Sequence, residues 1–227
     1  MTAEPVVLSW SGGKDSTLAL AALRQDPRVE VAALLTSVTL GYDRVSIHGV
    51  RRALLEAQAA ALGLPVFEVP LNPACSNEAY EAAFRAAANE VRSAFPAVRR
   101  IAFGDLFLED VRAYREALVA SMAMEALFPL WGRPTDALAE EFVALGYRAH
   151  LVCVDTRQLA ASFAGRTFDA ALLADLPPGV DPCGERGEFH TFVSAGPVFD
   201  RPIAVAPGEI VIREERFAYC DLLPGDG

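Results

Sequence analysis

The sequence predicts an α/β fold: a doubly wound, mostly parallel five-stranded sheet followed by a smaller α+β domain at the C-terminal end. Two observations predict it. Apolar runs of strand length alternate with amphipathic patterns of helix length through the first 130 residues. After Trp131 this alternation stops, and one helical pattern is followed by strand patterns. Strands separated by helices imply right-handed crossovers, and therefore a parallel sheet in the first part.

The sheet is predicted from five apolar runs. The strands are expected at residues 5–10, 29–36, 64–71, 98–104 and 127–131. The helices between them are expected at about 14–24, 48–62, 77–94 and 106–126. In such a sheet, ligands bind at the carboxyl ends of the strands, which makes the turn after the first strand the first place to look for a site.

The second part opens with a turn, and Thr135 is placed to cap a helix at 136–145. A strand is expected at 147–155, and residues 176–188 form the least regular segment of the chain. Two further stretches, 188–193 and 209–220, are expected as antiparallel strands. We therefore predict two domains, residues 1–132 and 133–227.

Composition excludes several classes of protein. The 227 residues are 52% hydrophobic and carry a net charge of −10, of which −3 lies before residue 133 and −7 after it. A surface of this charge repels polyanions, so an extended nucleic-acid groove is not expected. No apolar run is long enough to span a membrane, and the N-terminal MTAEPVVLSW has no basic segment of a signal peptide, so we expect a cytoplasmic protein. The four scattered cysteines are expected as thiols, and the C-terminal apolar strands could form the edge of a homodimer.

The turn between the first strand and the first helix reads SGGKDS, residues 11–16. Two glycines permit positive φ angles and let a ligand approach the backbone, and free N–H groups at a helix N-terminus bind anions. Lys14 is the single lysine among 20 Lys and Arg residues. A Walker A loop is absent, because Leu8 occupies its first glycine position and Asp15 follows the lysine. The turn therefore predicts a polyphosphate site, with Asp15 holding Mg²⁺ or orienting the loop; the alternative is a plain glycine-rich turn with a capping serine.

In its strand–turn–helix context, SGGKDS resembles the pyrophosphate loop of the ATP pyrophosphatase superfamily, whose members split ATP between the α and β phosphates. The resemblance implies that Lys14 offsets charge on the leaving group and that Asp15 is the metal ligand. It places the base of ATP near Thr36 and Ser37, at the end of the second strand. The residues that it implies for the pyrophosphate end are Ser11, Gly12, Gly13, Asp15 and Ser16.

A second candidate stretch is IAFGDLFLEDVRAYRE, residues 101–116. Gly104 and Asp105 end the fourth strand at the edge where the turn lies, so we predict that they line the ATP site and that Asp105 is catalytic. The spacing of Asp105, Glu109 and Arg112 predicts one helical face, which could bind substrate. The alternative is a capped helix with the surface ion pairs Glu109–Arg112 and Arg112–Glu116.

The third stretch is DPCGERGEFHTFVSAGPVF, residues 181–199. Alternation along the strand places Glu188 and His190 on one face with Phe192. A carboxylate and an imidazole could bind an amine, move protons or hold a metal, and we predict both as catalytic. The alternative is a polar loop beside an exposed strand face.

Together, SWSGGKDSTLAL, FGDLFLEDVRAYRE, PLWG and CGERGEFHTFV resemble the diphthine–ammonia ligase family over nearly the whole chain. Members of that family adenylylate a carboxylate with ATP and Mg²⁺, and ammonia then displaces AMP to give an amide. The resemblance implies that one wall of the substrate site is formed by Gly184, Glu185, Gly187, Glu188 and Thr191.

One segment departs from that family. SVTLGYDRVSIHGVRR holds Ser46 and His48 where the resemblance places the acceptor, but it has no methionine there. The Arg- and Ala-rich composition is typical of a GC-rich bacterial genome. We therefore expect the same chemistry on a different carboxylate, either a small molecule or protein-borne. Two alternatives stay open: a sulfur transferase that uses Cys183, and a sensor that binds ATP without chemistry.

Overall fold

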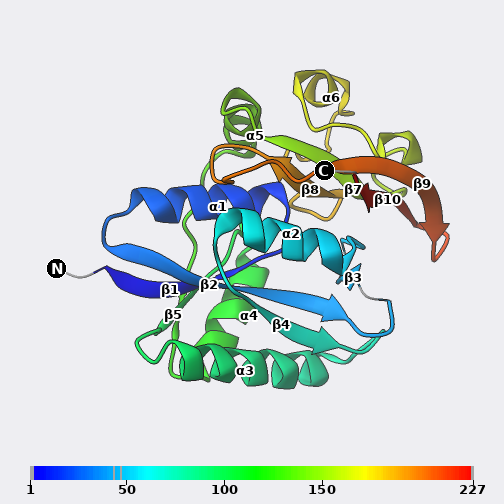
Figure 1. Ribbon diagram of the computed structural model, residues 1–227. Helices are drawn as coiled ribbons and strands as arrows, with labels where there is room; N and C mark the ends of the chain where they lie inside the picture. The colour runs from blue at the N-terminus through cyan, green and yellow to red at the C-terminus, as the bar shows by residue number, and fades with distance from the viewer. Residues whose placement is uncertain (1–2, 43, 47, 226–227) are drawn as a thin grey trace.

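The computed structural model describes residues 3–42, 44–46 and 48–225, and its main chain forms two sheets (Figure 1). The strands of the first sheet are β1 (Glu4–Ser9), β2 (Val29–Thr39), β3 (Arg44–Val45), β4 (Val66–Leu71), β5 (Arg100–Ala102) and β6 (Glu125–Leu127). Their order is β4–β2–β1–β5–β6, all parallel, with β3 paired antiparallel to the end of β2. The predicted doubly wound, mostly parallel sheet is confirmed, and β3 is an addition to its five expected strands.

Helices cover both faces of this sheet (Figure 1). On one face lie α1 (Lys14–Gln25) and α2 (Arg52–Leu62), and on the other α3 (Asn77–Ala94) and α4 (Glu109–Ala120). The central strand β1 is buried on both sides, with Val6 and Leu8 in one apolar cluster and Val7 in the other. The chain winds outward from β1 in both directions, so the switch point of the sheet lies at the turn after β1.

Three predicted boundaries are corrected. The helix expected at 48–62 begins at Arg52, because residues 48–51 form a turn and an extended N-cap. The helix expected at 106–126 is α4, and it ends before Ala123, whose φ of 55° turns the chain into β6. That strand covers 125–127 in place of the expected 127–131, since Pro129 has no N–H to give to a neighbouring strand.

The second part of the chain is built on an antiparallel sheet in the order β8–β7–β10–β9. Its elements are α5 (Thr135–Ala144), β7 (Arg148–Asp155), a 3₁₀ turn (Ala161–Phe163), α6 (Ala170–Asp175), β8 (Phe189–Ala195), β9 (Val205–Arg213) and β10 (Phe217–Pro224). The predicted strand at 188–193 corresponds to β8. The single strand predicted at 209–220 is wrong: the chain turns at Glu214 and Glu215, both with positive φ, so that this stretch forms parts of β9 and β10. The helix α6 was not predicted. Thr135 is not the predicted cap: Pro134 precedes the helix, and the Thr135 hydroxyl donates to Asp181 Oδ2 at 2.7 Å.

The two parts pack on one another through α1, α2 and β8 (Figure 1). One apolar cluster runs from β1, α1 and α2 into the core beneath β7 and β8. The division at residue 132 falls in the turn between β6 and α5 and stays a prediction. Over the described ranges, the chain has no helix with the length and apolar character needed to cross a membrane.

Candidate active site

The turn after β1 has the backbone of an anion site. Gly12 has a φ of 77°, and Gly13 is the N-cap of α1. The Gly13 carbonyl accepts from Ser16 Oγ at 3.0 Å and Thr17 Oγ1 at 2.9 Å. Ser11 Oγ lies 3.3 Å from the donating Gly13 N–H and 3.2 Å from Ser16 Oγ. The N–H groups of the first helical turn have no acceptors within the helix, so the turn suits a phosphate group.

Lys14 is buried where the two parts of the chain meet. Its Nζ lies 2.7 and 2.8 Å from the two carboxylate oxygens of Asp15 and donates to the Cys183 carbonyl. Its backbone N–H donates to Thr191 Oγ1 at 3.0 Å. Burial by itself lowers the pKa of Lys14, but Asp15, with smaller contributions from Cys183 and Glu185, raises it above its usual value. The ammonium is therefore charged at neutral pH.

Gln58 ties the turn to the second sheet. It is fully buried, accepts from Trp10 Nε1 at 3.1 Å, and donates to the carbonyls of Gly12 at 3.0 Å and Val193 at 2.6 Å. The Val193 N–H donates to Gly12 O at 2.9 Å. A Cβ on Gly12 would lie 2.6 Å from Gln58 Oε1, so only glycine fits there. Sequence analysis missed Gln58; its signal is a lone amide within the apolar face of α2.

Asp105 and Gly104 lie beside the turn, as predicted from the end of β5. A Cβ on Gly104 would stand 3.0 Å from the Asp15 carbonyl carbon, which shows how closely the two backbones approach. Asp105 forms an ion pair with Arg115 at 2.7 Å. It does not share a helical face with Glu109 and Arg112, because α4 begins only at Glu109. The spacing argument for that face was wrong.

Among the described residues, neither Glu109 nor Arg112 forms a hydrogen bond or ion pair with the turn residues. Glu109 is exposed at the start of α4. Arg112 pairs with Glu116 at 2.7 Å and lies over the rings of Trp131 and Phe128 at 4.7 and 5.1 Å. Of the two expected surface pairs, Arg112–Glu116 is present. The role of these residues in binding substrate stays a prediction.

The side chain of Glu185 extends from the loop before β8 to the backbone that follows β5, next to the turn. Its Oε1 accepts from the Leu106 N–H at 2.7 Å. Burial, together with the nearby charges of Asp15 and Asp105, raises the pKa of Glu185 to about 7. A carboxyl that titrates near neutral pH can gain and lose a proton under physiological conditions.

Protonation of Glu185 predicts how stability changes with pH. The ordinary pKa is 4.5 and the folded value about 7, so between these values the folded chain binds more protons than the unfolded chain. Stability contributed by this group is present at low pH and is lost as the pH rises from about 4.5 to 7. We expect Glu185→Gln to flatten this part of the curve of melting temperature against pH. Glu109→Gln, on the exposed start of α4, should keep the wild-type slope; an unchanged slope in Glu185→Gln would contradict the assignment.

His48 and His190 come together although 142 positions separate them in the sequence. Their ring centroids are 4.6 Å apart, and His48 Nδ1 lies 3.3 Å from the Ser46 carbonyl. Burial, with a smaller contribution from Lys14, lowers the pKa of His48 to about 4. Burial, followed by His48 and Lys14, lowers the pKa of His190 well below its usual value. Both imidazoles are therefore neutral at pH 7.

Two of the predicted residues, Thr36 and Ser37, lie in β2, and Ser46 follows β3 beside it. Thr36 Oγ1 is buried with no hydrogen-bond partner among the described residues. Ser37 O accepts from the Ser46 N–H at 2.9 Å, and the Ser46 hydroxyl lies 2.8 Å from that of Thr39. β1 ends opposite Leu35, so Val38 and Thr39 of β2 extend beyond it. Because β3 pairs with these two residues, the segment that contains Ser46 lies near the switch point of the sheet. Residues 43 and 47 of the same segment lie outside the described residues.

Glu188 holds the loop before β8. Its carboxylate is buried and accepts from the N–H groups of Asp181 and Arg186, each at 2.9 Å. Gly184 has a φ of 68°, and a Cβ there would lie 2.7 Å from Phe189 O; Gly187 has a φ of 82°. Both carboxylate oxygens of Glu188 are thus engaged by backbone donors, which is the arrangement of a residue that shapes the loop.

The described residues by themselves supply only some of the ligands that a metal ion needs. Within the described part of the chain, no group of three His, Cys, Asp or Glu residues could hold one. Asp15 is a carboxylate next to the anion-binding turn, and Mg²⁺ at nucleotide sites commonly takes one or two carboxylates together with phosphate oxygens. The donor set therefore fits Mg²⁺ that arrives with a polyphosphate.

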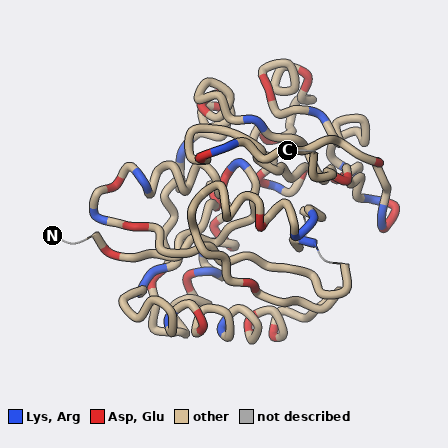
Figure 2. The backbone as a smooth tube through the Cα atoms, in the orientation of Figure 1, with Lys and Arg blue, Asp and Glu red and all other residues tan. Residues whose placement is uncertain are grey.

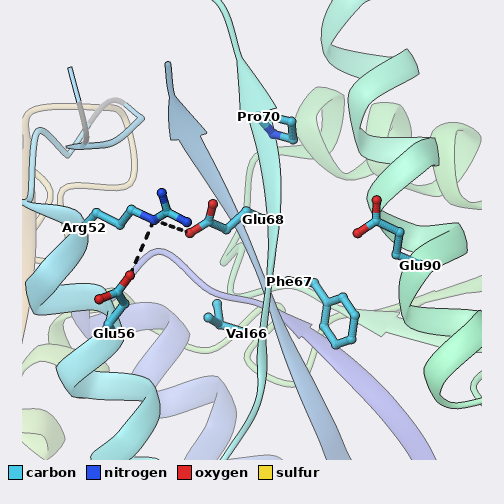
Figure 3. A pocket seen from close by; sticks show the side chains of 7 residues that line it. All are labelled: Arg52, Glu56, Val66, Phe67, Glu68, Pro70 and Glu90. Atoms are coloured by element: carbon cyan, nitrogen blue, oxygen red, sulfur yellow. Dashed lines mark ion pairs between the residues drawn. The ribbon is translucent and has the colours of Figure 1, made fainter. Parts of the chain in front are cut away.

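A hollow of about 460 Å³ lies elsewhere, along the edge strand β4 (Figure 3). Arg52 and Glu56 of α2 and Glu68 of β4 line one side, with Arg52 paired to Glu68 at 2.7 Å and to Glu56 at 3.5 Å. Phe67 and Glu90 line the side toward α3 (Figure 3). This hollow contains none of the predicted site residues, so it does not add to the site at the turn.

Two family models match the chain. A model described as the diphthamide synthase N-terminal domain matches residues 4–125, and a model described as the diphthamide synthase C-terminal domain matches residues 134–222. No curated protein matches the sequence. The two models together cover nearly the whole chain.

Proposed function

The chain belongs to the diphthamide synthase family, that of the diphthine–ammonia ligases, and on that premise we propose that it adenylylates a substrate carboxylate with ATP and amidates it with ammonia. The products are an amide, AMP and pyrophosphate. The observation that carries the proposal is the charged, buried Lys14 at the N-terminus of α1, beside the two glycines of the turn.

The turn residues bind the pyrophosphate end of ATP in this proposal. The N–H groups of Asp15 and Ser16 in the first turn of α1 donate to phosphate oxygens, while the Lys14 N–H stays on Thr191. The Lys14 ammonium stabilises the charge that develops when the bond to the α-phosphorus breaks. Mg²⁺, held by Asp15 and the phosphates, would neutralise further charge on the leaving group. The unpartnered Thr36 hydroxyl lies in β2 just past the level at which β1 ends, where the base of ATP is expected.

Ammonium must lose a proton before it attacks, and Glu185 is the best acceptor for it among the predicted residues. Its pKa of about 7 lies near neutral pH, and only its Oε1 has a backbone donor. Glu188 is engaged at both oxygens, and His190 has a pKa far too low for an efficient base. We therefore move the role of base from Glu188 or His190 to Glu185, and assign to His48 and His190 the binding of the neutral amine or acceptor.

Product analysis tests the proposal. The protein is incubated with Mg²⁺, ATP, ¹⁵N-ammonium and a deproteinised metabolite extract, beside an Asp15→Ala control, and the mixture is analysed by mass spectrometry. AMP, pyrophosphate and ¹⁵N in a new amide are expected only with the wild type. ADP and phosphate as products would overturn the proposal, and tight ATP binding without turnover across many carboxylates would favour the sensor.

The sulfur-transferase alternative is disfavoured by the state of Cys183. The thiol is buried, its Sγ donates to Thr135 O at 3.2 Å, and burial raises its pKa to about 12. Cys183→Ser, which keeps a donor at this position, is expected to retain ligase turnover within about threefold, since the thiolate is not the nucleophile. Loss of all turnover in a Cys183→Ser protein that melts at the wild-type temperature would favour sulfur transfer.

A further inference from the structure

Strand β9 leaves an edge of the second sheet open. In the described ranges, β9 pairs with β10 only, and it runs along the periphery of the molecule (Figure 1). The other edge strand of this sheet, β8, is engaged through Val193 with Gly12 of the turn. The row of outward backbone groups on β9 is therefore available for pairing with another strand.

The open edge is also apolar. Ile210 is 48% exposed and Ile212 57% exposed. They stand opposite Cys220 and Ala218 of β10, which are buried, so their side chains lie on the face that covers the core. The apolar face of the sheet thus continues to its open edge, where two isoleucines are about half exposed.

The sequence of this edge is complementary to itself in an antiparallel pair. Residues 209–213 read Glu-Ile-Val-Ile-Arg. In an antiparallel pair of two such strands centred on Val211, Glu209 stands opposite Arg213 of the other copy, and Ile210 stands opposite Ile212. Two-fold symmetry requires this kind of self-complementary patch. Charges of both signs lie at the tip of the β9–β10 hairpin (Figure 2), and neither Glu209 nor Arg213 has an ion-pair partner among the described residues.

We propose that β9 pairs with β9 of a second copy of this chain, joining two four-stranded sheets into one eight-stranded antiparallel sheet. The pair forms over residues 209–213, because Pro207 has no N–H and ends the pairing on its side. Four isoleucines, two from each copy, cover one another on the core face. Two Glu209–Arg213 pairs fix the register on the other face. This proposal does not depend on the proposed chemistry.

The first test is the molar mass in solution, measured by light scattering and by sedimentation over a dilution series. The wild type is expected as a dimer that dissociates on dilution. Ile212→Lys is expected to be monomeric, because a charge would face the Ile210 of the other copy. The matched control is Leu145→Lys on the loop after α5, where a leucine with 46% exposure lies away from β9; it should stay dimeric. Melting temperatures show that both variants fold.

The second test uses charge reversal. Glu209→Arg alone and Arg213→Glu alone each turn two favourable cross-strand pairs into two repulsive ones, and should raise the dimer dissociation constant by about tenfold or more. The double variant should recover the wild-type value. A mixture of the two single variants should form a mixed dimer more tightly than either forms alone.

If the wild type is monomeric at every concentration, the proposal is wrong. This outcome includes the case in which β9 pairs with a strand of another protein. A dimer that neither Ile212→Lys nor the single charge reversals weaken would also overturn the proposal, because a different surface would then join the copies. Charge reversals whose effects add without compensation would exclude the antiparallel register centred on Val211.

Discussion

Replacing Lys14 with methionine is expected to reduce the release of pyrophosphate by about a thousandfold, because it removes the buried positive charge that stabilises the leaving group. Methionine keeps the length of the side chain and leaves the turn backbone in place. The measurement is the steady-state rate of AMP and pyrophosphate formation with saturating Mg²⁺ and ATP. The control is Arg28→Met, which removes an exposed cation just after the C-terminal end of α1 and should keep nearly normal turnover.

Stability and catalysis can be separated at the same position. Lys14→Met leaves the Asp15 carboxylate without its partner and should cost about 3 kcal/mol of unfolding free energy. Adding Asp15→Asn removes the unpaired charge, so the double variant should regain much of the stability while its turnover stays as low as that of Lys14→Met or lower. Turnover by Lys14→Met within tenfold of the wild type would show that the turn does not act on the leaving group.

Gln58→Leu is expected to lower the free energy of unfolding by about 3 kcal/mol, since it leaves the buried Trp10 N–H and Val193 carbonyl without their hydrogen bonds. Turnover should fall as well, because Gly12 loses one of the two donors that hold it. The measurements are urea unfolding and the rate of pyrophosphate release. Gln25→Leu, the same change at an exposed position of α1, is the control and should be nearly neutral.

A double-mutant cycle tests the physical reason. Trp10→Phe removes the N–H that Gln58→Leu leaves unpaired, so the double variant should be less destabilised than the sum of the two single variants. Strictly additive effects, or a Gln58→Leu protein that unfolds at the wild-type urea concentration, would show that the buried network contributes little to the turn.

The sequence by itself determined the first sheet and its turn. Periodicity of two in buried strands and of 3.6 in helices is local, and it predicted five parallel strands together with the site at the end of β1. The positive φ predicted for the two glycines of the turn is present at Gly12 and absent at Gly13, whose φ is −90°. A Cβ on Gly13 would lie 3.0 Å from the Thr191 carbonyl oxygen, a contact that only the tertiary structure shows. Local patterns fail at Asp105: the sequence predicts a helix from residue 106, whereas α4 begins at Glu109, so the helical spacing does not apply to Asp105.

Only the tertiary structure decided which distant groups meet. His48 stands next to His190 because β3 pairs beyond the end of β1 while the edge of β8 packs on the turn. The sequence could not predict which of Glu185 and Glu188 is the better candidate for the base, because both lie in one irregular loop. They differ in what their carboxylate oxygens contact. Glu185 accepts from the backbone after β5, whereas Glu188 accepts from the backbone of its own loop. The periodicity of apolar residues in a sequence indicates which face of a helix or strand is buried. The partner across that face depends on how two sheets pack, and burial there sets the pKa values on which the proposed chemistry depends.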